Sequence, residues 1–382
     1  MVATAADLLK ALPADLHVLE YFVGPETVFV IDIKNKRVKQ VKRIGNADSL
    51  KNQINKLVHT YYQNGPDAML NSPRAFYQLS NSIYKQLFMA GIFTKNEPLC
   101  VVPDDIIGYL SFDGLITKDT YETNLFAWPF LIKQISTTYA FSLHTLTKNK
   151  RGTAAQSNFS GLFITHEHNH TPLPAVKKEA ETMESLVSGN YLYDEEVNTA
   201  SFFEEFEHTA VLHISTHAYL SGTRKEPTLD FGSEKLFLFE LQAKKNKPGL
   251  VVLSACRTGD GLLAKGEGII SLARGFSAIG TPATVAGLWN VNDDAGAKIT
   301  ADMYRFLTVG ESTGTALHHA KLKWLNSTQV SSALYLPYYW DSLILIGTDE
   351  PFQLRKANKV KLYLIFAGLL MVVTGLAFRI FK

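Results

Sequence analysis

The sequence predicts an α/β domain with a mostly parallel sheet flanked by helices. An N-terminal hairpin and helical layer precedes it, and a C-terminal transmembrane helix follows. Short apolar runs alternate with longer amphipathic stretches, and the runs at 210–215, 250–254 and 282–288 are apolar on both faces. Strands that alternate with helices indicate crossover units, and strands buried on both sides are typical of a parallel sheet. The unbroken apolar run Leu362–Phe378 predicts the membrane helix.

The same patterns locate the individual elements. Strands are expected at Thr27–Ile33, Pro98–Val102, Gly161–Thr165, Ala210–Ser215, Leu250–Ser254, Pro282–Leu288 and Ser342–Ile346. Helices are expected at Asp48–Tyr62, Pro73–Ala90, Pro174–Ser188, Ser201–Glu207, Glu267–Ile279, Asp293–Leu307 and Thr313–Trp324.

The N-terminal part, residues 1–150, is expected to hold a hairpin and helices. The hairpin joins Val28–Ile33 to Arg37–Ile44, with Asn35 and Lys36 near the turn. Residues 146–160 are polar and are expected to form a loop at a subdomain seam, and residues 151–350 are expected to form the second part, which holds the central strands. A further polar stretch, Tyr219–Glu226, also reads as a loop.

Charge and cysteine content exclude several classes of protein. The chain has 38 basic and 36 acidic residues and a formal net charge of +2, which leaves no electrostatic footprint for nucleic acid. Its 2 cysteines, Cys100 and Cys256, cannot build a disulfide framework, so a reducing, cytosolic setting is expected for the main domain. Cys100 lies within an apolar strand and is expected to be buried and inert.

The C-terminal apolar run has the composition of a tail anchor. It stands at the short end of the roughly 17–25 residues that span a bilayer, and residues 351–361 link it to the domain. A buried core helix is the alternative, although its unbroken apolar circumference favours a membrane. We therefore expect a single-pass C-terminal anchor in the lipid bilayer, with the domain on the cytoplasmic side.

Two of the central strands end in reactive side chains. The first, AVLHISTH, ends at His217, and the second, LVVLSAC, ends at Cys256. In parallel sheets, chemistry gathers beyond the carboxyl ends of the strands. If the two strands are neighbours, the imidazole can lower the pKa of the thiol and maintain a reactive thiolate. Each residue alone also fits a purely structural role, but the glycine-rich flanks and the pairing favour a nucleophile and its base.

Several motifs occur in an order that is typical of a known protein family. The strings are Leu212–His217, Val252–Gly259, Gly266–Gly268, Leu272–Phe276, Ala286–Val291 with Asp293, Tyr339-Trp340, Ile344–Gly347 and, earlier, Leu99–Pro103. The chain resembles a CHAT-domain protease, a relative of caspases and separases (clan CD peptidases), over roughly residues 15–350.

The resemblance implies a caspase-like fold and peptide-bond hydrolysis by a cysteine–histidine dyad. His217 corresponds to the general base and acid and Cys256 to the nucleophile. The oxyanion site corresponds to the backbone amides of Cys256 and Ala218. Caspases usually have glycine at the latter position, so Ala218 narrows the space above the amide.

The resemblance to separases also suggests a specificity residue. Asp293 corresponds to the acidic residue that holds a basic side chain of the substrate, which implies cleavage after Arg or Lys. The same position also suits an ordinary N-cap of the helix that follows.

No cofactor and no metal are expected. His166, His168 and His170 alternate in THEHNH, but no distant ligand matches them. The glycine-rich turn 259–268 lacks the Gly-Lys-Ser/Thr string of a phosphate loop.

We therefore expect a membrane-tethered cysteine endopeptidase that acts on protein substrates, in bacterial defence or signalling. A non-catalytic scaffold that uses the same fold for binding is the alternative, and acyl transfer by the same thiolate is a third possibility. Family members commonly carry a repeat array before the domain. Since this chain starts almost at the domain edge, we expect a regulatory partner to be a separate protein, unless the array has been lost or truncated.

Overall fold

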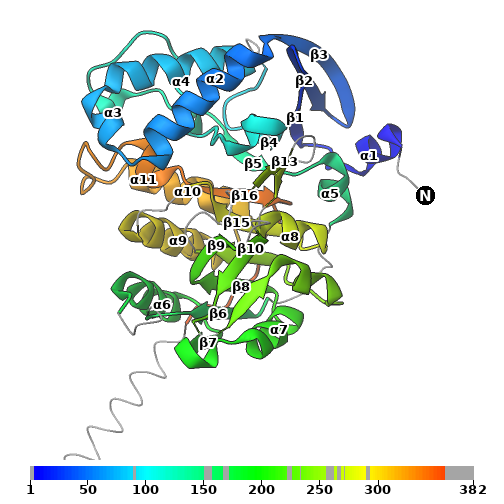
Figure 1. Ribbon diagram of the computed structural model, residues 1–382, viewed down its shortest axis with the longest axis vertical. Helices are drawn as coiled ribbons and strands as arrows, with labels where there is room; N and C mark the ends of the chain where they lie inside the picture. Colours follow the sequence, from blue (N-terminus) through cyan, green and yellow to red (C-terminus); the bar gives the residue numbers. More distant parts are fainter. Residues whose placement is uncertain are drawn as a thin grey trace, which may run out of the picture.

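The computed structural model describes residues 4–88, 92–149, 157–166, 172–221, 226–232, 234–254, 262–264, 268–270, 272–289 and 293–357. Its centre is an 11-stranded sheet in the order β3-β2-β1-β4-β5-β16-β15-β12-β8-β6-β7. The sheet runs the full height of the molecule in Figure 1. The predicted α/β class with a mostly parallel sheet is confirmed.

The strands of this sheet come from both parts of the chain. They are β1 (His17–Val23), β2 (Thr27–Lys34), β3 (Arg37–Asn46), β4 (Pro98–Val102), β5 (Ser136–Tyr139), β6 (Phe159–Phe163), β7 (Asn190–Tyr193), β8 (Val211–Ser215), β12 (Leu250–Leu253), β15 (Ala283–Gly287) and β16 (Leu343–Gly347). Smaller sheets pair β9 (His217–Ser221), β10 (Glu226–Asp230) and β11 (Lys235–Phe237), and β13 (Leu262–Ala264) with β14 (Gly268–Ile270).

Apart from the antiparallel hairpin of β2 and β3, the large sheet consists of two parallel blocks that run in opposite directions. β7, β6, β8, β12 and β15 are parallel to one another, and so are β1, β4, β5 and β16. The blocks meet where β15 and β16 pair antiparallel, with Ala283 opposite Gly347. As a result β16, from the end of the domain, closes the block that the N-terminal strands form.

Helices cover both faces of the sheet (Figure 1). The α-helices are α1 (Ala5–Ala11), α2 (Ala47–Leu57), α3 (Asp67–Asn71), α4 (Pro73–Leu87), α5 (Leu143–Lys148), α6 (Pro174–Leu186), α7 (Thr199–His208), α8 (Leu272–Ala278), α9 (Asp293–Leu307), α10 (Thr313–Leu325) and α11 (Pro337–Trp340). In the view of Figure 1, α6, α9 and α10 lie on the left face of the sheet and α5, α7 and α8 on the right. A π-helical turn, Val58–Gln63, continues α2, and short 3-10 turns lie at Asp105–Tyr109, Leu125–Ala127, Leu131–Lys133, Asp194–Glu196 and Leu238–Ala243.

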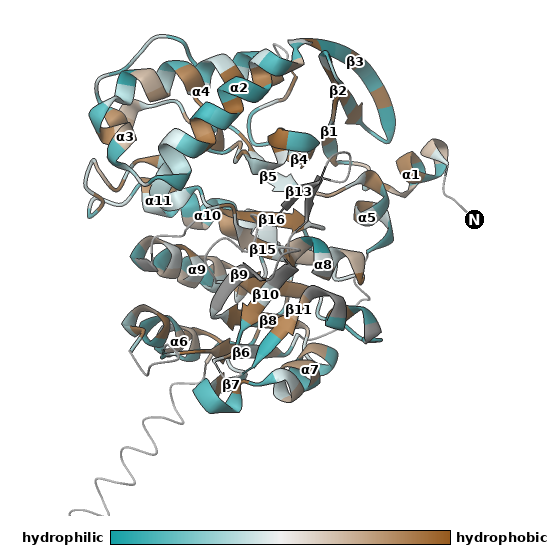
Figure 2. Ribbon diagram, viewed as in Figure 1, coloured by the Kyte–Doolittle hydropathy of each residue, from teal (hydrophilic) through white to brown (hydrophobic). Residues whose placement is uncertain are grey.

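Apolar strands between amphipathic helices produce a continuous core. All residues of β8, β12 and β15 are buried, and Figure 2 shows the brown of apolar residues along the middle of the sheet and teal on outer helix faces. Burying both faces of a strand requires such apolar runs, and this is why 210–215, 250–254 and 282–288 were identifiable as central strands.

The predicted hairpin is confirmed, but its prediction as a layer preceding the main sheet is wrong, because β2 pairs with β1 and so makes the hairpin part of that sheet. β2 and β3 pair antiparallel, and Lys34 lies opposite Arg37. Asn35 and Lys36 have positive φ angles of 53° and 60°, as a two-residue turn between twisted strands requires. β3 forms the edge of the sheet, where its lysines and a register shift after Asp32 protect the edge from further pairing.

Two local predictions are wrong. The predicted helix Glu267–Ile279 begins only at Leu272, because Gly268–Ile270 forms β14 and pairs with β13. The predicted loop Tyr219–Glu226 is partly strand, since β9 extends to Ser221 and pairs with β10. In both places the strand pairs with the strand next to it in the sequence, and each is too short for its periodicity to reveal the pairing.

The predicted transmembrane helix, Leu362–Phe378, lies outside the described residues. Within the described segments up to residue 357, no helix is sufficiently long and apolar to cross a bilayer.

A buried ionic network connects the two halves of the chain. Lys321 of α10 donates to Asp113 Oδ2 at 2.8 Å and to Asp341 Oδ1 at 3.3 Å, and Ser111 donates to Asp341 at 2.7 Å. Both ions of each pair are almost fully buried. Burial and the nearby Asp113 together raise the pKa of Asp341 to about 7, in spite of the adjacent Lys321. One ammonium therefore faces two carboxyl groups, and Asp341 is the one that binds a proton near neutrality.

Replacement of Asp341 by Asn should flatten the dependence of stability on pH. Because the pKa of Asp341 is raised from 3.8 to about 7 in the native state, its contribution to stability is complete below pH 4 and is lost as the pH rises through 7. Asp341→Asn removes this slope, which amounts to at most about 1.4 kcal/mol per pH unit. Urea unfolding between pH 5 and pH 8 measures it. The control Asp119→Asn removes an exposed carboxylate, and equal slopes in all three proteins would contradict the assignment.

Candidate active site

The strands that precede His217 and Cys256 are parallel neighbours. Leu250 to Leu253 of β12 pair in register with Val211 to Ile214 of β8. The pairing continues one step further, where the Ser254 amide donates to the Ile214 carbonyl at 2.8 Å. The carboxyl ends of both strands therefore lie side by side, on the line where these parallel strands end and which forms the carboxyl edge of the sheet. This placement is expected if the two residues share a cleft.

The structure places the backbone of His217 immediately beyond β8. Thr216 turns the chain, its hydroxyl donating to the Asp230 carbonyl, and His217 begins β9 opposite Asp230. Ala218 follows in β9, opposite Leu229. The side chains of His217 and Ala218 are not described, and Cys256 lies outside the described residues, three positions after the end of β12.

The third predicted residue belongs to the same edge. β15 pairs in parallel with β12 on the side opposite β8, and α9 begins at Asp293 shortly after β15 ends. The segment between them is anchored by Trp289, which is fully buried, stacks on Tyr62 at 4.2 Å and donates its indole N–H to the Tyr338 carbonyl at 3.0 Å. The side chain of Asp293 lies outside the part of the chain that the structure describes.

The two histidines of the HISTH string have different surroundings. His213 lies inside β8, fully buried, stacked on the Phe163 ring and with Nδ1 3.3 Å from the Tyr304 hydroxyl. Its position under α6 and α9 leaves it no access to solvent. Of the two, only His217 stands beyond the end of the strand.

Close to the carboxyl ends of β8 and β12, Glu179 of α6 contacts several polar groups. Its carboxylate accepts hydrogen bonds from Ser215 at 2.7 Å and Ser254 at 2.8 Å, and Oε1 lies 3.5 Å from His213 Nε2. Burial alone raises the pKa of Glu179, but the attraction of His213 and the hydrogen bonds to its carboxylate outweigh burial and hold the pKa below its ordinary value. The cluster therefore contains a buried, ionised carboxylate.

Glu179 is not among the residues predicted from the sequence, although a signal for it exists. α6 buries Glu179, Ala180 and Met183 on one stripe. A glutamate on the apolar stripe of an amphipathic helix is unusual, since glutamate is almost never fully buried without a partner. That pattern predicts a buried polar contact, but it does not name the partners.

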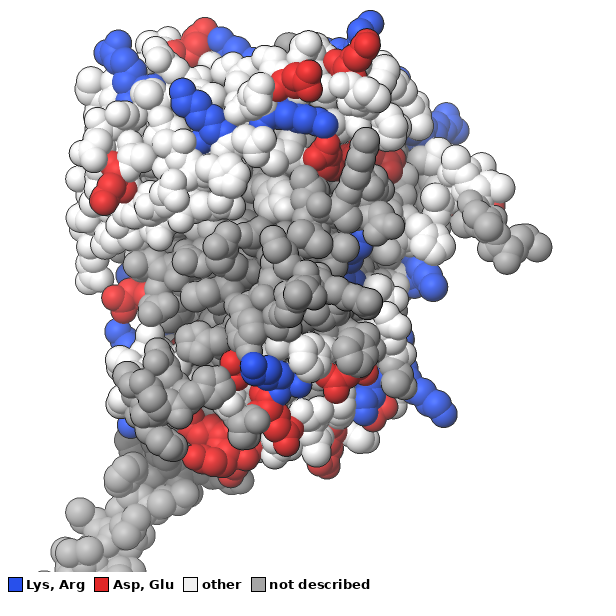
Figure 3. All heavy atoms as spheres, in the orientation of Figure 1, with Lys and Arg blue, Asp and Glu red and all other residues white. Residues whose placement is uncertain are grey.

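An acidic hollow lies at the same edge of the sheet, beyond β6 and β7. It has a volume of about 650 Å³, and its ionisable lining groups include Glu181, Glu184, Asp194 and Lys177. Figure 3 shows acidic side chains gathered around this end of the molecule. Because three carboxylates and one lysine line the hollow, it favours cationic groups over anionic ones.

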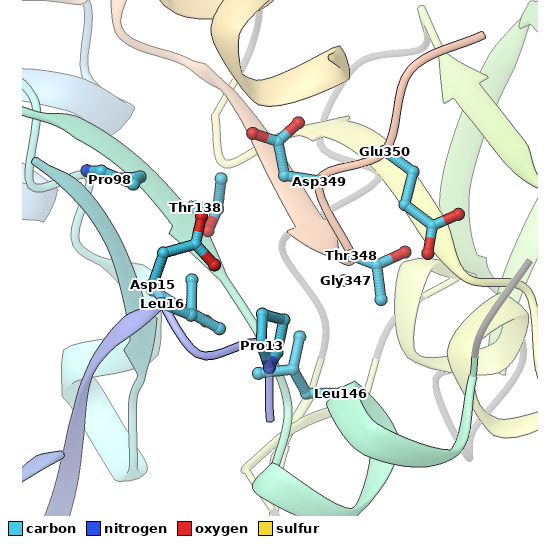
Figure 4. Close-up of a pocket in the computed structure, with 11 residues that line it drawn as sticks. Pro13, Asp15, Leu16, Pro98, Thr138, Leu146, Gly347, Thr348, Asp349 and Glu350 are labelled. Carbon is cyan, nitrogen blue, oxygen red and sulfur yellow. The ribbon is translucent and has the colours of Figure 1, made fainter. Parts of the chain in front are cut away.

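A smaller cavity lies at the opposite edge, by the amino end of β15. Figure 4 shows its walls, which come from the chain after α1, from β4 and β5, and from Gly347–Glu350. Its volume is about 180 Å³. Asp349 on its wall accepts the Gly314 amide at 2.6 Å, and burial raises the pKa of that carboxyl.

Cys100 lines the same small cavity and is unsuited to nucleophilic chemistry. It is 1% exposed, and burial raises the pKa of its thiol to about 12. The prediction that Cys100 is buried is confirmed. Because a nucleophilic cysteine must ionise, Cys256 is the better candidate of the two.

The described residues contain no group of three His, Cys, Asp or Glu side chains able to hold a metal. His166 lies 3.4 Å from Asp194 and 2.9 Å from the Thr165 hydroxyl. His168 and His170 lie outside the described residues.

Comparison with known proteins yields one family and a set of similar folds. The CHAT domain model matches residues 78–348. No curated protein matches the chain. Two structures of the Saccharomyces cerevisiae separase–securin complex, at 2.6 and 3.0 Å resolution, resemble it with TM-scores of 0.55 and 0.57 and identities of 10% and 9%. They cover 91% of this chain, which spans 31% of the matched chain.

The Arg-specific cysteine proteinase gingipain R is a weaker match, at a TM-score of 0.45 and 10% identity over 81% of this chain and 76% of that chain. At these identities the similarity to separase concerns the fold alone. The CHAT match spans most of the domain, including the strands that precede His217 and Cys256. The chain therefore belongs to the CHAT domain family.

Proposed function

We propose that this protein is a caspase-like cysteine endopeptidase that cleaves protein substrates after Arg or Lys. The observation that carries the proposal is the parallel pairing of β8 with β12, which brings the chain ends leading to His217 and Cys256 to one edge of the sheet. Membership of the CHAT family and the separase-like fold support it. The buried state of Cys100 leaves Cys256 as the candidate thiol.

The proposed reaction is ordinary thiol-dependent peptide hydrolysis. His217 accepts the thiol proton, and the Cys256 sulfur attacks the scissile carbonyl carbon. The backbone amides of Ala218 and Cys256 stabilise the oxyanion. His217 then donates its proton to the leaving amine as the C–N bond breaks. Water, deprotonated by His217, hydrolyses the thioester and releases the acid and free Cys256.

We assign the preference for a basic residue to Asp293. Its place at the start of α9, beyond β15, puts it at the edge to which β12 leads Cys256. A carboxylate there can accept two hydrogen bonds from an arginine. The acidic hollow lined by Glu181, Glu184 and Asp194 at the same edge also suits a cationic substrate.

We further propose that Leu362–Phe378 anchors the domain to a membrane on its cytoplasmic side. An anchor raises the local concentration of the enzyme near substrates at that surface. We also propose a separate regulatory protein as partner; the similar separase structures are complexes with securin.

Labelling with a biotinylated peptidyl chloromethyl ketone that ends in arginine should modify Cys256 in a manner that depends on His217. His217→Ala should slow the labelling by about 10²-fold or more, because the imidazole no longer accepts the thiol proton. Mass spectrometry of the labelled peptide measures this. Cys100→Ala and the exposed His144→Ala are controls that should label normally. Labelling indifferent to His217, or absent altogether, would contradict the protease and favour a binding scaffold.

Replacement of Asp293 should change substrate preference. For a fluorogenic peptide with arginine before the cut, Asp293→Asn should lower kcat/KM about 10- to 100-fold, the value of one charged hydrogen bond. Asp294→Asn, which removes the neighbouring and exposed carboxylate, is the matched control. If both variants cleave the arginine peptide equally well, Asp293 is only a helix cap.

The membrane proposal is tested by flotation of the full chain with liposomes of phosphatidylcholine and phosphatidylglycerol. The full chain should float and resist carbonate extraction, whereas a chain ending at Ala357 should remain in the soluble fraction. Leu370→Arg should weaken insertion, at a cost of about 2.5–3.5 kcal/mol for a charge at the helix centre. Equal flotation of the full and shortened chains would refute the anchor.

A further inference from the structure

Glu179 forms hydrogen bonds to the ends of both strands that lead to the proposed dyad. Its Oε2 accepts the Ser215 hydroxyl at 2.7 Å, and its Oε1 accepts the Ser254 hydroxyl at 2.8 Å. Ser215 is the last residue of β8, and Ser254 is the residue after β12. One carboxylate therefore bridges two neighbouring strands at the point where their regular pairing stops.

The two serines hold equivalent positions in the chain. Ser215 precedes His217 by two residues, and Ser254 precedes Cys256 by two residues. Since Ile214 pairs with Leu253, Ser215 and Ser254 stand next to each other in register. Each serine is thus two residues away from a member of the proposed dyad.

The surroundings make this bridge rigid. Glu179 is 5% exposed and Ser215 is 1% exposed. His213 lies two residues before Ser215 in β8, between Phe163 and Tyr304. Its Nε2 is 3.5 Å from Glu179 Oε1. A buried carboxylate with several partners has no alternative arrangement in which its charge is satisfied.

We propose that Glu179 is a positioning residue of the active site: its carboxylate clamps Ser215 and Ser254 together and thereby sets the separation of His217 and Cys256. The inference rests on the proposed protease function, and it adds a residue that never touches substrate. Nucleophile and base must meet within hydrogen-bond reach, and a displacement of about 1 Å costs about 10²-fold in rate.

The decisive measurement is a comparison of kcat, KM and thermal stability in Glu179→Gln. The amide keeps the shape of the side chain but removes the charge and one of the two acceptors. It should lower kcat about 10- to 100-fold on the fluorogenic arginine peptide, with KM within about twofold. Iodoacetamide, which needs no substrate pocket, should alkylate Cys256 correspondingly more slowly.

A matched control separates positioning from general destabilisation. Asp32→Asn removes another buried carboxylate, the partner of His17 at 2.9 Å, in the N-terminal hairpin. It should lower the melting temperature but leave kcat near that of the natural chain. Glu179→Gln must therefore lie below Asp32→Asn in kcat by at least about 10-fold.

The serines give a second test if Glu179→Gln does not fold. Ser215→Ala and Ser254→Ala each remove one arm of the clamp and should each lower kcat about threefold to 10-fold, whereas Ser254→Thr, which keeps the hydroxyl, should restore most of it. If the natural chain labels at Cys256 but these variants match Asp32→Asn, the clamp is overturned and the protease stands. If the natural chain itself shows no His217-dependent labelling, both proposals fall.

Discussion

The central constraint of this structure is the parallel pairing of β8, β12 and β15 inside a sheet that is covered on both faces. Each of these strands is buried along its whole length, so its backbone groups can be satisfied only by the neighbouring strands. That requirement fixes the register, with Val252 beside both His213 and Val285. Because all three strands run in one direction, the segments that follow them leave the sheet at one edge. The candidate active site is a consequence of that arrangement.

Buried charge holds together parts of the chain that are far apart in sequence. Glu179 connects α6 to the ends of β8 and β12, and Lys321 connects α10 to Asp113 and Asp341. Such groups are weak contributors to net stability, since desolvation offsets most of the attraction between the charges. They do raise the free energy of any packing in which a buried charge has lost its partner, because its desolvation is then not offset. Their role here is to select one arrangement of strands and helices over near alternatives.

The fold also explains how a separase-like architecture persists at 9–10% identity. An α/β sheet tolerates substitution wherever an apolar side chain of similar volume fills the same space. The sheet's two blocks, joined at β15 and β16, require only that the strands be apolar and the helices amphipathic. The proposed function depends on few positions, chiefly those that follow the carboxyl ends of β8, β12 and β15.

The sequence by itself determined the fold class, the central strands and the identity of the candidate dyad. Apolar runs on both faces identify buried strands, and α9 begins at Asp293 and ends at Leu307 as its periodicity predicts. The short strands β1, β5, β9 and β14 escaped prediction, because a short strand is stabilised mainly by pairing and packing with its neighbours, which a local pattern of residues does not show. Only the tertiary structure showed that β8 and β12 are adjacent and that Glu179 connects Ser215 to Ser254. The periodicity of apolar residues indicates which face of a helix is buried. The partner of a buried carboxylate, by contrast, depends on how the helices pack on the sheet.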